Sequence, residues 1–209
     1  MRKEGDEIKR SEITKREILK AAEEKFASKG LYGARVDEIA ECAQINKRMI
    51  YAYFGSKEQL YTEVLKVVYN RLAEREKLLL SDDSDCVQAI RNIISMYFEF
   101  LQGDPHFVKL IMWENLNEAR YIQDSGAVVM KDYALRAARR VLEKGIRLGV
   151  FKGNIDIEEF ILSLNMFAFS YFSNIYTMAE LMQIDFHQPQ QIKKRADYVT
   201  QILLDYIKK

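Results

Sequence analysis

The chain has 209 residues, of which 48% are hydrophobic and 30% charged, so it can bury a sizeable core and does not have the composition of a disordered protein. Two prolines and nine glycines are too few for the turns of an all-β protein, and two cysteines exclude a disulfide scaffold. The net charge of +1 gives no overall attraction to polyanions, although residues 1–57 carry 13 basic against 10 acidic side chains.

Helix signals then follow one another along the whole chain. The predicted helices lie at about 14–30, 36–43, 46–54, 56–80, 87–103, 105–117, 125–148, 156–181 and 190–208. Their starts are marked by capping residues, namely Thr14 with Glu17, Asn46, Ser56 with Gln59, Asp104 before Pro105, and Asp156. The sequence therefore predicts an all-α fold of about nine helices, in which the first three are close together and the others are longer.

The first functional pattern is the pair of short helices at 36–43 and 46–54, which are joined by only two residues. Two short helices with a tight turn are typical of the helix-turn-helix, whose second helix lies in the major groove of DNA. Lys47 and Arg48 fall at the tip of that helix, where their side chains can donate hydrogen bonds to guanine.

Three further side chains extend this pattern. Tyr51 and Tyr53 can contact phosphates or a thymine methyl group, and Lys57 opens the next helix, whose N-terminus suits a backbone phosphate. Each residue alone also has an ordinary explanation, because the tyrosines can be core residues and Lys47 with Arg48 a solvated pair of charges. Together with the caps and the spacing, they favour DNA binding over a purely structural three-helix unit.

At these residues the chain resembles the TetR (tetracycline-repressor) family of transcriptional regulators. The shared pattern comprises T-x-x-x-I-L-x-A-A from Thr14, V-x-x-I-A from Val36 and, above all, I-Y-A-Y-F-G-S-K-E-Q-L from Ile50 to Leu60. Beyond Tyr61 the resemblance is limited to the number, order and total length of the helices.

The resemblance implies contacts with DNA bases or phosphates from Lys47, Arg48, Met49, Tyr51, Tyr53 and Lys57. The family usually has Ser or Thr at the start of its second helix, where this chain has Ala34 and Arg35, and Arg35 is expected to supply an electrostatic contact instead. Gln44 stands where the tight turn usually has Gly, so a left-handed backbone there would be strained. Because Arg48 and Met49 replace smaller residues, the operator sequence cannot be transferred from relatives.

The resemblance also implies two domains. Residues 1–57 would form the helix-turn-helix DNA-binding domain, and residues 58–209 the larger helical domain for effector binding and dimerisation. One recognition helix makes too few contacts for tight specific binding, so we expect a homodimer on a pseudo-palindromic double-stranded operator. In the family, the last two long helices of each subunit form the interface, which here means the helices at 156–181 and 190–208.

An uncharged segment, residues 160–179, lies within this expected interface. It is long enough to cross a bilayer, but it contains six polar side chains and is flanked by acidic residues rather than by Lys or Arg. A helix that is apolar on all sides is equally typical of one buried on two sides, here by its own domain and by the dimer partner. We therefore expect no membrane span.

The family further implies a small apolar or amphipathic effector bound in the larger domain. The candidate effector-binding residues are Tyr97, Trp113, Asn165 and Phe169. Aromatic residues at helical spacing are equally typical of plain core, so both interpretations stay open. The implied mechanism is a population shift in which the effector changes the spacing of the two recognition helices through the helix at 56–80 and so releases a repressor from DNA.

No catalytic pattern supports an enzyme, since the sequence lacks the nucleophile-elbow, zinc-protease, P-loop and dinucleotide-binding motifs. Cys42 and Cys86 match no metal or redox spacing and indicate free thiols in a reducing cytoplasm, so no metal or cofactor is expected. The first ten residues are too charged for a signal peptide. The remaining alternative is a helical interaction module that keeps this fold without specific operator binding.

Overall fold

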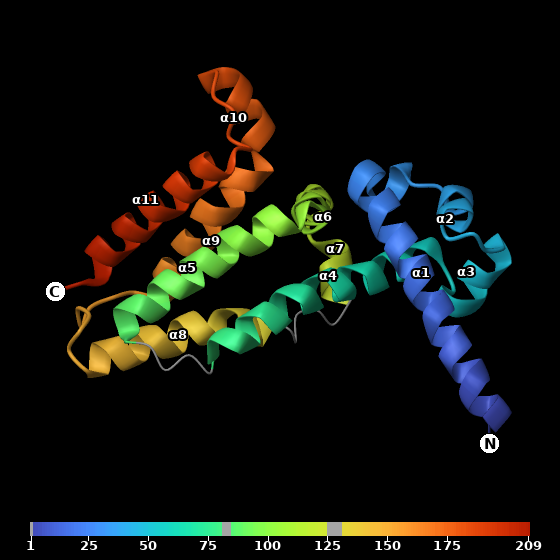
Figure 1. The fold of residues 1–209 in the computed structure, drawn as a ribbon, viewed down its shortest axis with the longest axis horizontal. Coiled ribbons are helices and arrows are strands. Elements are labelled where there is room, and N and C mark those ends of the chain that lie inside the picture. Colours follow the sequence, from blue (N-terminus) through green and yellow to red (C-terminus); the bar gives the residue numbers. More distant parts are fainter. Residues whose placement is uncertain (1, 81–84, 125–130) are drawn as a thin grey trace. The chain divides into compact units, whose positions relative to one another are not determined.

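Eleven α-helices form the part of the chain that the computed structural model describes, which is residues 2–80, 85–124 and 131–209 (Figure 1). Side chains are described for these residues except 2–8, 80, 124 and 131–135. The helices are α1 (Arg2–Gly33), α2 (Val36–Cys42), α3 (Lys47–Phe54), α4 (Lys57–Leu80), α5 (Cys86–Gly103), α6 (Pro105–Leu116), α7 (Arg120–Asp124), α8 (Lys131–Arg147), α9 (Ile157–Ser173), α10 (Ile175–Met182) and α11 (Pro189–Ile207). Within these ranges the only β-pairing is one antiparallel bridge between Phe151 and Lys208. The predicted all-α fold is confirmed.

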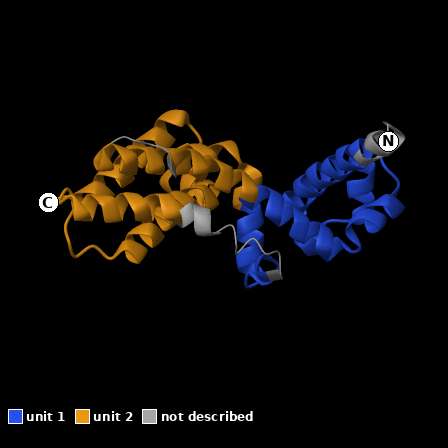
Figure 2. Cartoon of the chain, turned by 90° about the horizontal axis from the view of Figure 1, so that it is seen from below, with its two compact units in different colours: residues 1–69, 109–128 blue, residues 70–108, 129–209 orange. Residues whose placement is uncertain are grey.

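The chain divides into two compact units (Figure 2). Unit 1 contains residues 1–69 and 109–128, and unit 2 contains residues 70–108 and 129–209. The most deeply buried side chains of unit 1 include Ile18, Phe26, Ile39, Ile50, Leu60 and Tyr61, and those of unit 2 include Ile90, Ile94, Leu142, Phe160 and Val199. The boundary predicted between residues 57 and 58 separates a DNA-binding domain from an effector-binding domain. The two compact units do not test this division by function, so it stays a prediction.

Helix α1 begins earlier than the sequence predicts. It extends from Arg2, and the Thr14 hydroxyl donates to the carbonyl oxygen of Arg10 at 2.9 Å, one turn back within the same helix. The prediction that the helix begins at Thr14 is therefore wrong, because threonine can satisfy its hydroxyl inside a helix and the preceding Lys, Arg and Glu residues favour helix. The predicted break at Gly30 is confirmed by its non-helical backbone (φ 68°, ψ 175°).

The elements around α3 agree closely with the prediction. The Asn46 side chain accepts a hydrogen bond from the backbone N–H of Arg48 at 2.8 Å, as an N-cap does. Gly55 ends the helix with φ 78°, and the Ser56 hydroxyl oxygen then accepts from the backbone N–H of Gln59 at 3.1 Å at the start of α4. Gln44 does adopt a left-handed backbone, with φ 54°.

The later helices differ from the prediction at two places. The helix expected at 156–181 is interrupted at Asn174, whose side-chain amide donates to the carbonyl oxygen of Ser170 at 3.0 Å, so α9 and α10 are separate helices. The five-residue α7 was not expected from the sequence. The helix predicted from Ser125 has its first residues outside the described ranges, and α8 is described from Lys131.

The uncharged segment is consequently divided between α9, with 17 residues, and α10, with eight. In the described part of the chain, no helix combines the length and the apolarity that a bilayer crossing requires.

Candidate functional site

The turn between α2 and α3 presents one face of α3 to solvent. Ile50 is buried, and it holds α3 against the core of unit 1. Arg48, Met49 and Tyr51 are exposed, and Arg48 and Tyr51 are one helical turn apart. This arrangement of one buried and several exposed side chains at the helix tip is what a recognition helix needs in order to reach base edges.

Lys47, at the first position of α3, forms an ion pair within unit 1. Its ammonium group lies 2.8 Å from a carboxylate oxygen of Asp37, which is in the first turn of α2. The hydrogen bond with Asp37 raises the pKa of Lys47, and both side chains are exposed. The predicted DNA contact of Lys47 would require this exposed ion pair to break.

The other predicted contacts surround this helix. Arg35 is exposed and precedes α2 with an extended backbone (φ −106°, ψ 135°). Lys57 is half-buried and donates to the carbonyl oxygen of Ala34 at 3.3 Å, which fixes the start of α4 near the start of α2. Tyr53 is also half-buried, with the Lys15 ammonium group 5.9 Å from the centre of its ring. All seven predicted DNA-contacting residues lie in unit 1.

The part of α6 that belongs to unit 1, together with α7, packs against the core of that unit. The Tyr61 ring is fully buried and meets the rings of Phe26 and Tyr121 edge-on at 5.0 and 5.4 Å. Glu114, in α6, is also buried, and one of its carboxylate oxygens accepts from the backbone N–H groups of Tyr121 and Ile122. Burial, with the nearby Glu114 charge, raises the pKa of Tyr61. Glu114 thus satisfies the N–H groups at the start of α7, a role that its sequence position does not reveal.

The structure does not bring the four predicted effector-binding residues into one unit. Trp113 belongs to unit 1, where its ring lies so close to Gly30 that a Cβ atom there would be 2.8 Å from it. Tyr97, Asn165 and Phe169 belong to unit 2. Asn165 uses its side-chain amide to donate to the carbonyl oxygen of Ile161 in its own helix.

Tyr97 contacts a buried residue that no sequence pattern singles out, Glu76. Its hydroxyl donates to a carboxylate oxygen of Glu76 at 2.6 Å, and both side chains are buried. Burial raises the pKa of Glu76 to about 7 and that of Tyr97 well above its ordinary value. Glu76 lies in the charged run AEREK, which resembles a solvated helix face, so the sequence contains no signal of its burial.

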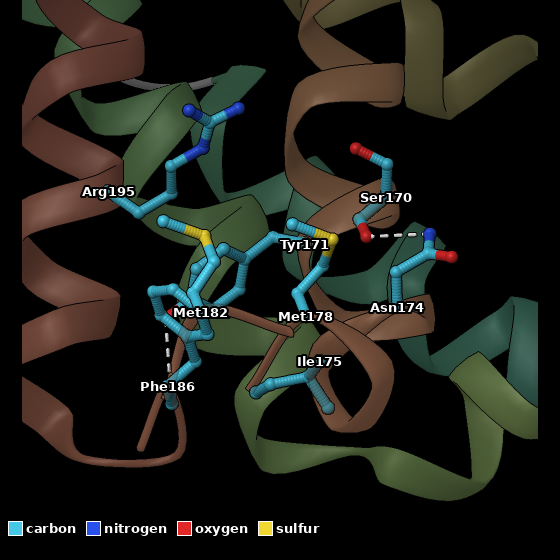
Figure 3. Close-up of a pocket in the computed structure, with 8 residues that line it drawn as sticks. All are labelled: Ser170, Tyr171, Asn174, Ile175, Met178, Met182, Phe186 and Arg195. Atoms are coloured by element: carbon cyan, nitrogen blue, oxygen red, sulfur yellow. Dashed lines mark hydrogen bonds between the residues drawn. The ribbon is translucent and has the colours of Figure 1, made fainter. Parts of the chain in front are cut away.

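A hollow of about 410 Å³ lies between α9, α10 and α11 of unit 2 (Figure 3). Its lining consists of Ser170, Tyr171, Asn174, Ile175, Met178, Met182, Phe186 and Arg195. The Tyr171 hydroxyl donates to the carbonyl oxygen of Phe186 at 2.8 Å and so holds the loop after α10 against α9. None of the four predicted effector-binding residues lines this hollow, and its methionine and aromatic lining suits either a ligand or another protein chain.

Exposed apolar side chains also lie on the two helices expected to dimerise. On α9, Leu162 is 50% exposed and Met166, one turn later, is 52% exposed. On α11, Tyr198 and Ile202 are exposed in the same way. Exposed apolar side chains are typical of surfaces that another chain covers, so these four residues are candidates for a dimer interface.

Two protein families match most of the chain between them. Residues 18–64 match the family described as bacterial regulatory proteins, tetR family, and residues 87–203 match the tetracyclin repressor-like C-terminal domain. Among single proteins, the HTH-type transcriptional repressor NicS of Pseudomonas putida is 31% identical over 200 residues, which cover 95% of this chain and 93% of the relative.

Solved structures share the fold at lower identity. The ketosteroid transcriptional regulator KstR2 of Mycobacterium tuberculosis has a TM-score of 0.71 at 20% identity, covering 93% of this chain and 95% of that one. The transcriptional regulator FadR of Bacillus subtilis, in complex with stearoyl-CoA, has a TM-score of 0.67 at 22% identity, covering 91% and 98%.

Proposed function

The chain belongs to the tetracycline-repressor (TetR) family of bacterial transcriptional regulators, and on that premise we propose how it regulates transcription. It is a DNA-binding, ligand-responsive repressor. As a homodimer it binds a pseudo-palindromic operator in the cytoplasm, and a small apolar or amphipathic effector releases it. The observation that carries this proposal is the capped helix α3, which exposes Arg48, Met49 and Tyr51 while Ile50 anchors it to the core.

The reading residues have distinct parts in this proposal. Lys47 and Arg48 donate to base edges, Met49 and Tyr51 contact a thymine methyl group or the sugar-phosphate backbone, and Tyr53 donates to a phosphate. Arg35 and Lys57, at the starts of α2 and α4, bind phosphates on either side of the groove and set the orientation of α3.

Dimerisation supplies the second recognition helix. The proposed interface consists of α9 and α11, and it is supported by the exposed Leu162, Met166, Tyr198 and Ile202. An interface of this kind is isologous, so the same surface patch of both copies forms it around a two-fold axis. The operator should have the same symmetry.

Effector release is proposed as a shift between two states of the dimer. NicS is named a repressor, and FadR was solved with stearoyl-CoA, which supports a repressor with a ligand-binding helical domain here. Helix α4 contributes residues to both units, so a ligand that favours one state would change the spacing of the recognition helices. A coupling of about 1–3 kcal/mol is sufficient.

A gel-shift experiment across genomic fragments tests the proposal against the alternative of an interaction module. A saturable shift of a few fragments, which unlabelled copies of the same fragments compete away, is the expected result. Smearing that depends only on salt and not on sequence would contradict operator binding and favour the interaction module.

A further inference from the structure

Glu76 is buried without the partners that a buried carboxyl group normally has. It is 1% exposed, and one of its oxygens, Oε1, accepts the hydrogen bond from Tyr97. The other oxygen, Oε2, is buried and has no hydrogen-bond partner, and no cationic side chain pairs with Glu76 among the described residues. A buried polar atom without a partner is uncommon in native proteins and needs a physical explanation.

Comparison with Glu114 argues against a purely structural role. Glu114 is equally buried, and its Oε1 likewise has no hydrogen-bond partner, but its Oε2 accepts from two backbone N–H groups at the start of α7 and so stabilises the fold. Among the described residues, Glu76 accepts only from the hydroxyl of Tyr97. Burying a carboxyl group costs stability, and here no backbone group benefits from it.

Buried apolar residues flank Glu76 and Tyr97 on their own helices. Leu72 and Ala73, one turn earlier on α4, are buried, and so are Ile93 and Ile94, one turn before Tyr97 on α5. Apolar walls with one or two placed polar groups are the usual composition of a small-molecule site.

We propose that Glu76 is the polar anchor of the effector site and that the effector is an amphipathic molecule with a basic nitrogen, whose N–H group donates to Oε2 of Glu76. The apolar body of the effector packs on the faces of α4 and α5 that carry Leu72 and Ile94. This inference rests on the proposed effector response and adds the chemical class of the effector. A cationic donor is favoured over a neutral one because it also neutralises the ionised carboxyl group in a site of low dielectric constant.

The test uses matched probes on the full-length protein. Benzylamine, hexylamine and cyclohexylmethylamine are each compared with the alcohol and the carboxylate of the same skeleton, by titration calorimetry or ligand-observed NMR. At least one amine should bind the wild type about tenfold more tightly than its alcohol, the gain expected of a charge-assisted hydrogen bond. Glu76→Gln should remove this preference, and Glu114→Gln, the same substitution at the other buried glutamate, should keep it.

A second measurement does not depend on a variant. Because burial raises the pKa of Glu76 to about 7, the carboxyl group is protonated at pH 6 and must ionise when an amine cation binds. Calorimetry in two buffers of different ionisation enthalpy should therefore detect the release of about one proton at pH 6 and none at pH 8.5. Tyr97, the titratable group that faces Glu76 in the described part of the chain, has its pKa raised and does not titrate in this range.

Three results would overturn the inference: no amine preferred over its alcohol, a preference that survives in Glu76→Gln, or binding without proton release at pH 6. Gel shifts with the wild-type protein separate these results from a failure of the proposed function. Operator binding without amine preference contradicts only the effector class, and amine preference without operator binding contradicts only the DNA-binding role.

Discussion

The ion pair of Lys47 with Asp37 sets the resting position of a residue at the tip of the recognition helix. Exposed ion pairs contribute little to stability, so this one orders the side chain at little cost and can be broken by DNA. The sequence predicts Lys47 as a DNA contact because the helix-turn-helix pattern is local. It does not predict the partner, because Asp37 lies ten residues earlier and reaches Lys47 only through the turn between α2 and α3.

We expect Lys47→Ala to weaken binding to the specific operator by about tenfold or more, because a base or phosphate contact is lost. Fluorescence anisotropy with a labelled operator measures the change. Asp37→Asn is the matched control, since it removes the ion pair but keeps the lysine, and it should bind at least as tightly as the wild type. Equal weakening by both substitutions would mean that the pair, and not Lys47, supports binding.

Lys57→Ala should instead weaken all DNA sequences about equally, because Lys57 is proposed to contact a phosphate. Measured across a salt series, the slope of the logarithm of affinity against the logarithm of salt concentration should fall by about one. A loss confined to one operator sequence would show that Lys57 reads bases.

The Glu76 and Tyr97 pair could not be predicted from the sequence, because the two residues lie 21 positions apart on different helices and their contact depends on tertiary packing. The sequence makes Tyr97 an effector-binding candidate by its residue type alone. The structure adds the carboxyl group to which its hydroxyl donates.

Glu76 should make stability depend on pH. The pKa of Glu76 is raised from 4.5 to about 7 in the folded protein, so folding favours the protonated carboxyl group. The stabilisation by this protonated group is fully present below about pH 4.5, falls as the pH rises, and is lost above about pH 7. Urea unfolding measures the free energy of unfolding at pH 5 and at pH 8. Between these two pH values the wild type should lose about 2–3 kcal/mol more of this free energy than Glu76→Gln does. Parallel pH profiles of the two proteins would mean that Glu76 titrates normally.

At the scale of elements, the sequence predicts the start of a helix where a short polar side chain caps its N-terminus. Asn46, Asp104 and Asp156 each accept a hydrogen bond from a backbone N–H of the helix that follows. Thr14 did not act in this way, because the helix continues upstream of it. The interruption at Asn174 was also missed, since an asparagine side chain can bond either to the backbone or to solvent and only the fold decides.

Asn46→Ala should lower the free energy of unfolding by about 1 kcal/mol, because the N–H of Arg48 loses its acceptor. Asn46→Ser keeps an acceptor oxygen and should cost only a fraction of this. Chemical denaturation of the three proteins measures the effect. If Ser and Ala behave alike, the cap does not stabilise α3.

At the scale of the molecule, the all-α fold and the order of most helices were predictable from capping residues and helical periodicity. The division into DNA-binding and dimerising parts rests on the family resemblance and stays a prediction. Which side chains are exposed on these helices could not be predicted from the sequence. The sequence left open which side of the helix at 156–181 meets the partner, and the exposure of Leu162 and Met166 supports the proposal that this side does.

Leu162→Glu together with Met166→Glu should convert the dimer to a monomer of 24.5 kDa, because four carboxylates, two from each copy, would enter the proposed apolar interface. Light scattering after gel filtration measures the mass, and anisotropy should show the loss of operator binding. Leu148→Glu is the control, since Leu148 is 61% exposed and lies outside α9 and α11. A double variant that remains dimeric would place the interface elsewhere.

The left-handed backbone of Gln44 means that a single substitution in this turn could increase the stability of the protein. A non-glycine residue in that conformation costs roughly 1–2 kcal/mol, and Gln44→Gly would recover much of this cost without touching a DNA contact. A chain with the substitution could tolerate a destabilising change on α3 that the present chain could not. The turn therefore influences how readily the protein acquires a new operator specificity during evolution.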